Sequence, residues 1–159
     1  MKDLQKTTRK IIFILPLLLL VFSFTSIEKK SIKLISASSE NWVSGINGGG
    51  KGTEYYLKIL ILSPNKIEFD SLWINHTAFK THLANPSKVI SNKPITFSEN
   101  DTITVRVSES TLPKQPSNIQ ISVPPIKYKG EALLRYYDNG KAKYLVIKKI
   151  NKKTSINRP

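Results

Sequence analysis

The dipeptide Asn139-Gly140 constrains the fold of this chain more than any other feature of its sequence. It separates two segments, residues 131–138 and 141–150, in which more than half of the residues are apolar or aromatic. Asn-Gly is the pair that two-residue type I′ turns favour, because both central residues of such a turn need a positive φ. The sequence therefore predicts an antiparallel β-hairpin that turns at Asn139-Gly140.

The two-residue turn also sets the register of this hairpin, and side-chain chemistry agrees with that register. Asp138 falls opposite Lys141, and Arg135 falls opposite Tyr144. The same register pairs Glu131 with Lys148, Ala132 with Ile147, Leu133 with Val146, and Leu134 with Leu145. Opposite-charge, cation–aromatic and apolar pairs each contribute roughly 0.2 to 1 kcal/mol across strands, and a shifted register would lose them together.

Alternation with a period of two recurs along the chain and predicts further strands. They fall at residues 41–44, 53–62, 67–74, 102–108 and 118–123, with short candidates at 89–90 and 94–97. The turn of residues 63–66 has Pro64 at its second position, where the fixed φ of proline fits. Residues 53–62 and 67–74 are therefore predicted to pair as an antiparallel hairpin. Residues 76–83 fit either a short strand or a short helical segment.

The alternation also assigns faces to two of these strands. Residues 53–62 begin with Glu54 on an open face and end covered on both faces. We therefore expect this strand to run from the rim of a sheet into its core. In residues 67–74 the alternation places Trp73 on the same face as Phe69.

Strands at short intervals, turns marked by Pro and Gly, and the lack of a long amphipathic helix indicate an all-β fold. We expect an antiparallel, immunoglobulin-like β-sandwich of about seven or eight strands, with a small barrel as the alternative. The domain is predicted at residues 40–150, and residues 27–39 are either a spacer or a first edge strand. Residues 151–159 form a basic tail that we expect to fray. The chain has no Cys, so its core alone must stabilise it.

The first 26 residues match a secretory signal peptide or an N-terminal membrane anchor helix. A head with four Lys or Arg precedes an apolar run at residues 11–22 and then small polar residues. Extended to Ile27, the run has 17 residues, the lower limit of the roughly 17 to 25 that cross a bilayer as a helix. Cleavage would release the body, whereas retention would leave membrane contact only through residues 11–27. In both cases we expect an exported bacterial protein that is periplasmic, on the cell surface or secreted.

The exported part is strongly basic. The formal net charge is +14, and removal of the four Lys or Arg and the one Asp before the apolar run leaves +11. Export and the lack of a nucleic-acid motif argue against nucleic acid as the partner. We expect instead an anionic envelope component, either a glycan or a lipid headgroup, or an acidic protein surface. The candidate binding surface is the hairpin face that carries Arg135, Tyr137, Tyr144 and Lys148.

A glycine-rich run precedes the strand at residues 53–62. It contains Gly45, Gly48, Gly49, Gly50 and Gly52. The run matches part of a phosphate-binding loop, but Gly52 stands where Ser or Thr would hold magnesium, and a strand follows in place of a helix. We therefore predict a loop whose backbone needs positive φ and no nucleotide cofactor, with a backbone nest for an anion as the lesser alternative.

No catalytic constellation is recognisable, and we predict no enzymatic activity, no metal and no other cofactor. His76 and His82 are the only histidines, their spacing fits no metal pair, and Cys is absent. The favoured function is a non-enzymatic binding or accessory module. One alternative is an exported enzyme in which Glu68, Asp70 and these histidines converge in a pocket. Another is a membrane-tethered structural subunit that docks through an unpaired edge strand.

Overall fold

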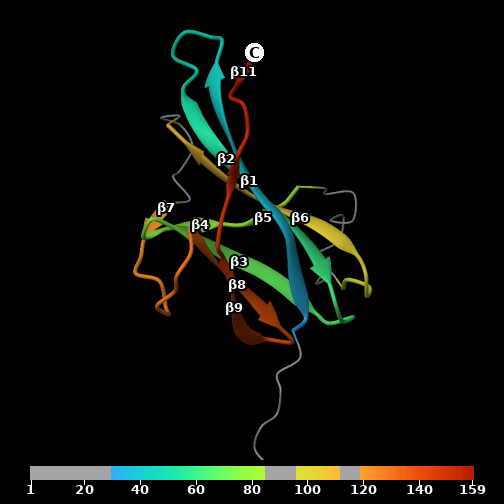
Figure 1. The fold of residues 1–159 in the computed structure, drawn as a ribbon. Helices are drawn as coiled ribbons and strands as arrows, with labels where there is room; N and C mark the ends of the chain where they lie inside the picture. The colour runs from blue at the N-terminus through green and yellow to red at the C-terminus, as the bar shows by residue number, and fades with distance from the viewer. Residues whose placement is uncertain (1–29, 85–95, 112–118) are drawn as a thin grey trace, which may run out of the picture. The chain divides into compact units, whose positions relative to one another are not determined.

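The computed structural model describes residues 30–84, 96–111 and 119–159, and the regular elements in them are all β-strands (Figure 1). The all-β prediction is confirmed for this part of the chain. Within these residues no helix is long and apolar enough to span a membrane. The predicted signal or anchor at residues 1–26 lies outside the described residues, as does the candidate strand at 89–90.

The strands form two sheets. Their bounds in chain order are β1 Ile32–Ser44, β2 Lys51–Ile61, β3 Ile67–Ile74, β4 Thr77–Lys80, β5 His82–Leu83, β6 Thr102–Ser110, β7 Ile119–Ile121, β8 Ala132–Asp138, β9 Lys141–Ile147, β10 Asn151–Lys152 and β11 Ile156–Arg158. The first sheet has the order β10-β1-β2-β6-β5, with β11 also paired to β1, and the second has the order β7-β4-β3-β8-β9. β10 and β11 run parallel to β1, whereas the other pairs in these sheets are antiparallel.

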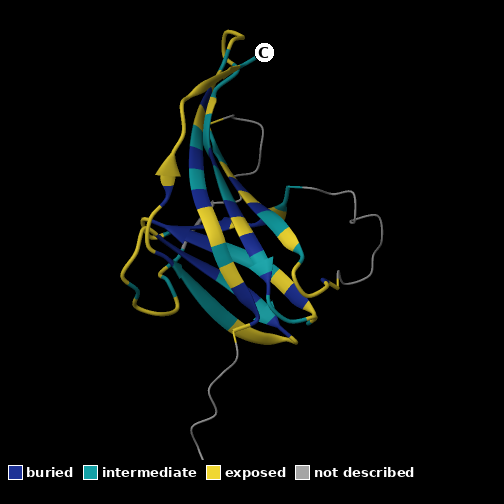
Figure 2. Cartoon of the chain, turned by 45° about the vertical axis from the view of Figure 1, so that its right-hand side comes forward, coloured by how far each residue is buried: buried dark blue, intermediate teal, exposed yellow. Residues whose placement is uncertain are grey.

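The two sheets share one hydrophobic core, to which each contributes the side chains of its inner face. These include Leu57, Ile59, Ile61, Val105 and Val107 from the first sheet and Leu72, Leu134 and Ile147 from the second, each at most 1% exposed. Buried and exposed residues alternate along the strands (Figure 2), as a period of two requires. Full burial of such a side chain contributes about 1.5 to 3 kcal/mol.

The hairpin at Asn139-Gly140 is confirmed. β8 and β9 pair residue by residue in the predicted register, without a bulge. Asn139 and Gly140 have φ angles of 49° and 79°, as a type I′ turn requires. The contacts of the two predicted charge pairs differ from the prediction. The Asp138 carboxylate lies 2.9 Å from the ammonium of Lys143, which is more buried than Lys141. Glu131, predicted opposite Lys148, precedes β8, and its carboxylate accepts the Ile150 N–H at 2.7 Å.

The predicted hairpin between residues 53–62 and 67–74 is wrong, because the two strands lie in different sheets. β2 pairs with β1 and β6, whereas β3 pairs with β4 and β8. The segment between them is held to the β8–β9 turn, where the Asn139 N–H donates to the Lys66 carbonyl at 2.9 Å. Both strands have an apolar face, and two facing sheets bury these faces against each other. A turn at Pro64 is compatible with either arrangement.

The first strand starts before the predicted domain. β1 begins at Ile32, within residues 27–39 that the sequence assigns to a spacer or an edge strand, and ends at Ser44. Its register shifts between Leu34 and Ser36. A bulge of this kind moves every later side chain to the other face. The bulge therefore interrupts the alternation that would have revealed the strand.

A second bulge, between Phe69 and Ser71 of β3, changes the face on which Trp73 lies. The alternation predicts Trp73 on the face of Phe69, but Leu72 takes the inner position and is fully buried in the shared core. Trp73 belongs to a separate buried cluster. Asp70 is the residue that the bulge inserts, because it has no partner in the β3–β8 register.

The C-terminal residues pair with the first sheet, contrary to the expectation that residues 151–159 fray. β10 and β11 run along β1, with Ser38 opposite Asn151. Main-chain pairing makes this contact while most of the side chains are exposed, so the segment has no alternating apolar pattern. Residues 76–83, which fitted strand or helix, contain the strands β4 and β5.

Gly52 of β2 lies opposite Trp42 of β1, and its missing side chain makes room for the indole. A Cβ atom at position 52 would lie 2.1 Å from the Glu109 carbonyl oxygen and 2.8 Å from Trp42 Nε1. We expect Gly52→Ala to lower the free energy of unfolding by roughly 1 to 3 kcal/mol, as overpacking does. Urea denaturation followed by tryptophan fluorescence measures the change.

Gly45→Ala is the matched control for this substitution. A Cβ atom at position 45 would lie 3.4 Å from the Arg158 carbonyl oxygen, which is an ordinary contact. The free energy of unfolding should change by less than about 0.5 kcal/mol. Equal losses for the two variants would contradict the close approach of Trp42 to Gly52.

Candidate functional site

The candidate binding surface is the outer side of the second sheet, which we call the aromatic face. It carries the residues predicted from the sequence: Arg135, Tyr137, Tyr144 and Lys148. Arg135 and Tyr137 lie on β8 and Tyr144 lies on β9, while Lys148 follows β9 directly. Because Leu134 faces the shared core, the neighbouring Arg135 points away from it. The two tyrosines are half-buried and Lys148 is exposed.

Trp73 lies beneath the aromatic face and was not part of the predicted site. Its side chain is 3% exposed, and Tyr144 packs against the cluster that contains it. Its indole N–H donates to Ser122 Oγ at 3.0 Å, which satisfies the buried polar atom. The guanidinium carbon of Arg135 lies 5.1 Å from the Trp73 ring centroid and 6.0 Å from that of Tyr137. At these distances both rings attract the cation.

Asp70 binds the guanidinium of Arg135. The Asp70 Oδ2 atom accepts a hydrogen bond from Arg135 Nε at 2.6 Å and forms an ion pair with its Nη2. Ser71 Oγ donates to the same oxygen at 2.8 Å. Burial would lower the pKa of Arg135, but the hydrogen bond and charge of Asp70 raise it above its ordinary value. Asp70 compensates this charge, whereas Lys148 and Lys80 of β4 are exposed cations of the aromatic face.

The glycine-rich run forms the turn between β1 and β2. Gly48 and Gly50 have φ angles of 80° and 79°, in agreement with a loop that needs positive φ. Three N–H groups of the turn donate to carbonyls of the protein itself: Ser44 to Gly50 at 3.0 Å, Gly49 to Ile46 at 2.9 Å, and Gly45 to Arg158 at 2.7 Å. These three groups are not available to an anion, which weakens the nest interpretation.

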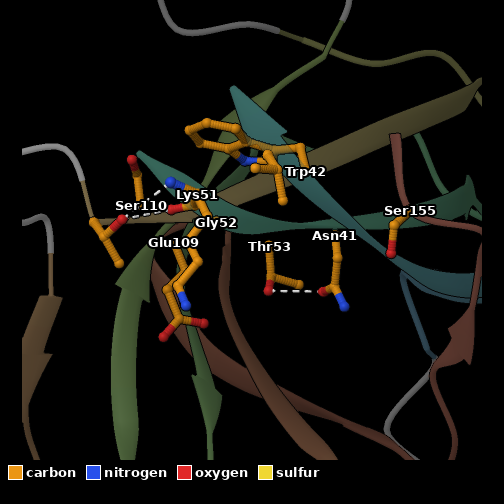
Figure 3. Close-up of a pocket in the computed structure, with 10 residues that line it drawn as sticks. Asn41, Trp42, Lys51, Gly52, Thr53, Glu109, Ser110 and Ser155 are labelled. Atoms are coloured by element: carbon orange, nitrogen blue, oxygen red, sulfur yellow. Dashed lines mark hydrogen bonds between the residues drawn. The ribbon is translucent and has the colours of Figure 1, made fainter. Parts of the chain in front are cut away.

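A trough lined mainly by polar residues lies beside this turn and consists of two hollows of about 400 Å³ each, both lined by Asn41 and Thr53. Figure 3 shows the first hollow, which lies on the first sheet, whereas Ile74, Asn75 and Glu131 also line the second. Lys51 and Glu109 line the first hollow, where Thr53 Oγ1 donates to Asn41 Oδ1 at 3.0 Å. Tyr55 lines the second, and burial together with Glu109 raises the pKa of its phenol. The trough therefore offers hydrogen-bonding groups to a polar ligand.

The carboxylates and histidines considered for catalysis lie on different sheets. Glu68 and Asp70 are on β3, each in an ion pair with a basic side chain. His76 belongs to the β3–β4 turn and His82 to β5 of the first sheet, and both are exposed. Within the described ranges no three His, Asp or Glu side chains are grouped so that they could hold a metal ion.

Glu54, predicted on an open face, is instead buried on the outer side of the first sheet, where its side chain is 1% exposed. Its carboxylate accepts hydrogen bonds from Arg106 Nη2 at 2.5 Å and from the Tyr56 hydroxyl at 2.5 Å, and it lies 2.9 Å from Arg158 Nη1. Burial would raise the pKa of Glu54, but Arg158, Tyr56 and Arg106 lower it from 4.5 to about 2. No local signal predicts this cluster, because Arg158 is distant in the sequence.

Comparison with known proteins assigns no family to the chain. Searches against protein-family models, curated proteins and solved structures found no match.

The lowered pKa of Glu54 predicts that the free energy of unfolding decreases in acid. Its pKa is about 2 in the folded protein against an ordinary 4.5, so it stabilises the fold fully above pH 4.5 and progressively less as the pH falls towards 2. The difference corresponds to about 3 kcal/mol. Between about pH 5 and pH 2, the free energy of unfolding of the wild type should fall by about this amount more than that of Glu54→Gln. Urea denaturation at each pH measures both profiles.

Glu68→Gln is the matched control, because the Glu68 side chain is 54% exposed and solvent screens its pairing with Lys66. Its profile should follow that of the wild type. Parallel profiles for the wild type and Glu54→Gln would contradict a depressed pKa at Glu54.

Proposed function

We propose that this chain is an exported, non-enzymatic binding module that recognises an acidic glycan of the cell envelope through its aromatic face. The observation that carries the proposal is the position of the half-exposed Tyr137 and Tyr144 beside the stack of Arg135 on Trp73. Rings held on a sheet surface offer apolar area to a ligand at low cost in side-chain entropy. In this proposal the body is an immunoglobulin-like antiparallel β-sandwich.

The chemistry of the aromatic face favours a sugar polymer over a lipid surface. Saccharides have apolar C–H faces that pack on aromatic rings, and Lys148 would bind an acidic group. Insertion into a membrane interface needs exposed large hydrophobic side chains. Among the described residues, no such side chain belongs to β8 or β9. In the described residues the exposed large hydrophobics lie outside these two strands: Ile35, Val43, Ile46, Val123, Ile126 and Ile156.

Export is part of the proposal and is supported by the signal pattern of residues 1–26. A charge of +11 after the basic head and apolar run suits anionic surroundings outside the cytosol. The placement of Glu68 and Asp70 in surface ion pairs supports a binding role over catalysis. The alternative of a tethered subunit differs in keeping residues 11–27 as an anchor.

The intact mass of the protein from its native host separates free export from tethering. We expect the loss of about the first 26 residues, because a signal peptide is removed after export. A full-length mass in the membrane fraction would contradict release and favour the anchor.

Binding to immobilised polygalacturonate, an acidic polysaccharide, tests the aromatic face. We expect retention that weakens as salt is added. Tyr137→Ala removes a half-exposed ring and should weaken binding about three- to tenfold. Lys148→Gln should weaken binding by a smaller factor and reduce its salt dependence. Near-UV circular dichroism confirms that each variant is folded.

Lys33→Gln is the matched charge control, because Lys33 is an exposed lysine of β1 on the first sheet. It should bind as the wild type does. Equal losses for Lys33→Gln and Lys148→Gln would contradict recognition by the aromatic face and indicate non-specific charge attraction. Retention on anionic lipid vesicles without retention on polygalacturonate would contradict the glycan and favour a lipid headgroup.

A further inference from the structure

β11 occupies the edge of β1 with little burial of its side chains. Its three residues pair with residues 42–44, and the Gly45 N–H donates to the Arg158 carbonyl at 2.7 Å. Ile156 is 38% exposed, and Asn157 is exposed as well. Apart from Arg158, a short, solvated edge strand of this kind opens at low cost in free energy.

Arg158 makes the side-chain contacts that anchor β11 to the sheet. Its guanidinium carbon lies 4.9 Å from the centroid of the Trp42 ring, and its Nη1 lies 2.9 Å from Glu54 Oε1. Trp42 is 6% exposed and Glu54 is 1% exposed. An aromatic ring beside a buried carboxylate is a receptor for a planar cation. We call Trp42, Glu54 and the β1 edge at residues 42–44 the arginine socket.

The arginine socket selects its occupant by backbone and by side chain. The β1 edge offers main-chain hydrogen bonds to an extended segment only. Without Arg158, the Glu54 carboxylate would keep Arg106 and Tyr56 but lose one of the two cations that offset its burial. A lysine would supply the charge but not the planar group that stacks on Trp42.

We propose that the arginine socket also accepts β11 of a second copy of the chain, so that strand exchange links the copies. The second copy carries the same residues 156–158 and makes the same contacts, so exchange costs the entropy of association and little else. Residues 153–155 join β10 to β11. The Lys153 N–H donates to the Ser39 carbonyl at 2.8 Å, but Thr154 and Ser155 are exposed and belong to neither strand, which lets β11 turn away from its own body. Protein concentration therefore decides which copy fills the socket.

Cysteine cross-linking tests the exchange in the full chain, which has no Cys of its own. Val43 and Asn157 are exposed register partners, so V43C and N157C bring two thiols within disulfide range when β11 lies on β1. Chains with V43C alone and chains with N157C alone are mixed at high concentration and oxidised with glutathione disulfide. We expect the mixed dimer in excess over random pairing. Adding R158A to the N157C chain should lower the yield of the mixed dimer at least about tenfold.

Two further variants make the result decisive. The double variant V43C/N157C should form an intramolecular disulfide at low concentration, because β11 then fills its own socket. R158K, in the N157C chain, keeps the charge and should give a yield between those of Arg158 and R158A. Mixed dimers in random proportion, or at equal yield with and without R158A, would overturn the proposal, as would failure of the double variant to close.

Discussion

Burial of two apolar sheet faces against each other is the interaction on which the rest of this structure depends. The chain has no Cys to form a disulfide, so the inner faces of β2 and β6 must be buried against those of β3 and β8. Leu57, Val105 and Leu134 are each at most 1% exposed in this shared core. The requirement separates β2 and β3, which follow one another in sequence, into different sheets. It thereby decides which side chains each outer face presents.

A bulge in β3 determines which side chains build the aromatic face. The insertion of Asp70 lets Leu72 enter the core while Trp73 lies on the other side, beneath Arg135. Asp70 itself binds the Arg135 guanidinium. The buried ring and the carboxylate that orders the aromatic face thus come from one local irregularity. A regular strand would have put Trp73 on the opposite face and left Arg135 without this ring.

Local signals predicted the local parts of the structure, whereas contacts between distant segments left no signal. Asn139-Gly140 predicted both a hairpin and its register, because nearby residues determine turn geometry. Pro64 shows that the chain turns but not which sheet the next strand joins. Glu54 has the appearance of a rim residue because one of its partners, Arg158, is more than a hundred residues away. Trp73 was assigned to the wrong face because a bulge leaves no mark in the alternation.

The aromatic face and the arginine socket both require that β2 and β3 belong to different sheets. Nuclear Overhauser effects between backbone protons test this arrangement most directly. We predict contacts between Leu57 of β2 and Val105 of β6, which are register partners, and between Leu72 of β3 and Leu134 of β8. Backbone contacts between β2 and β3 in a hairpin register, in place of these, would contradict the account.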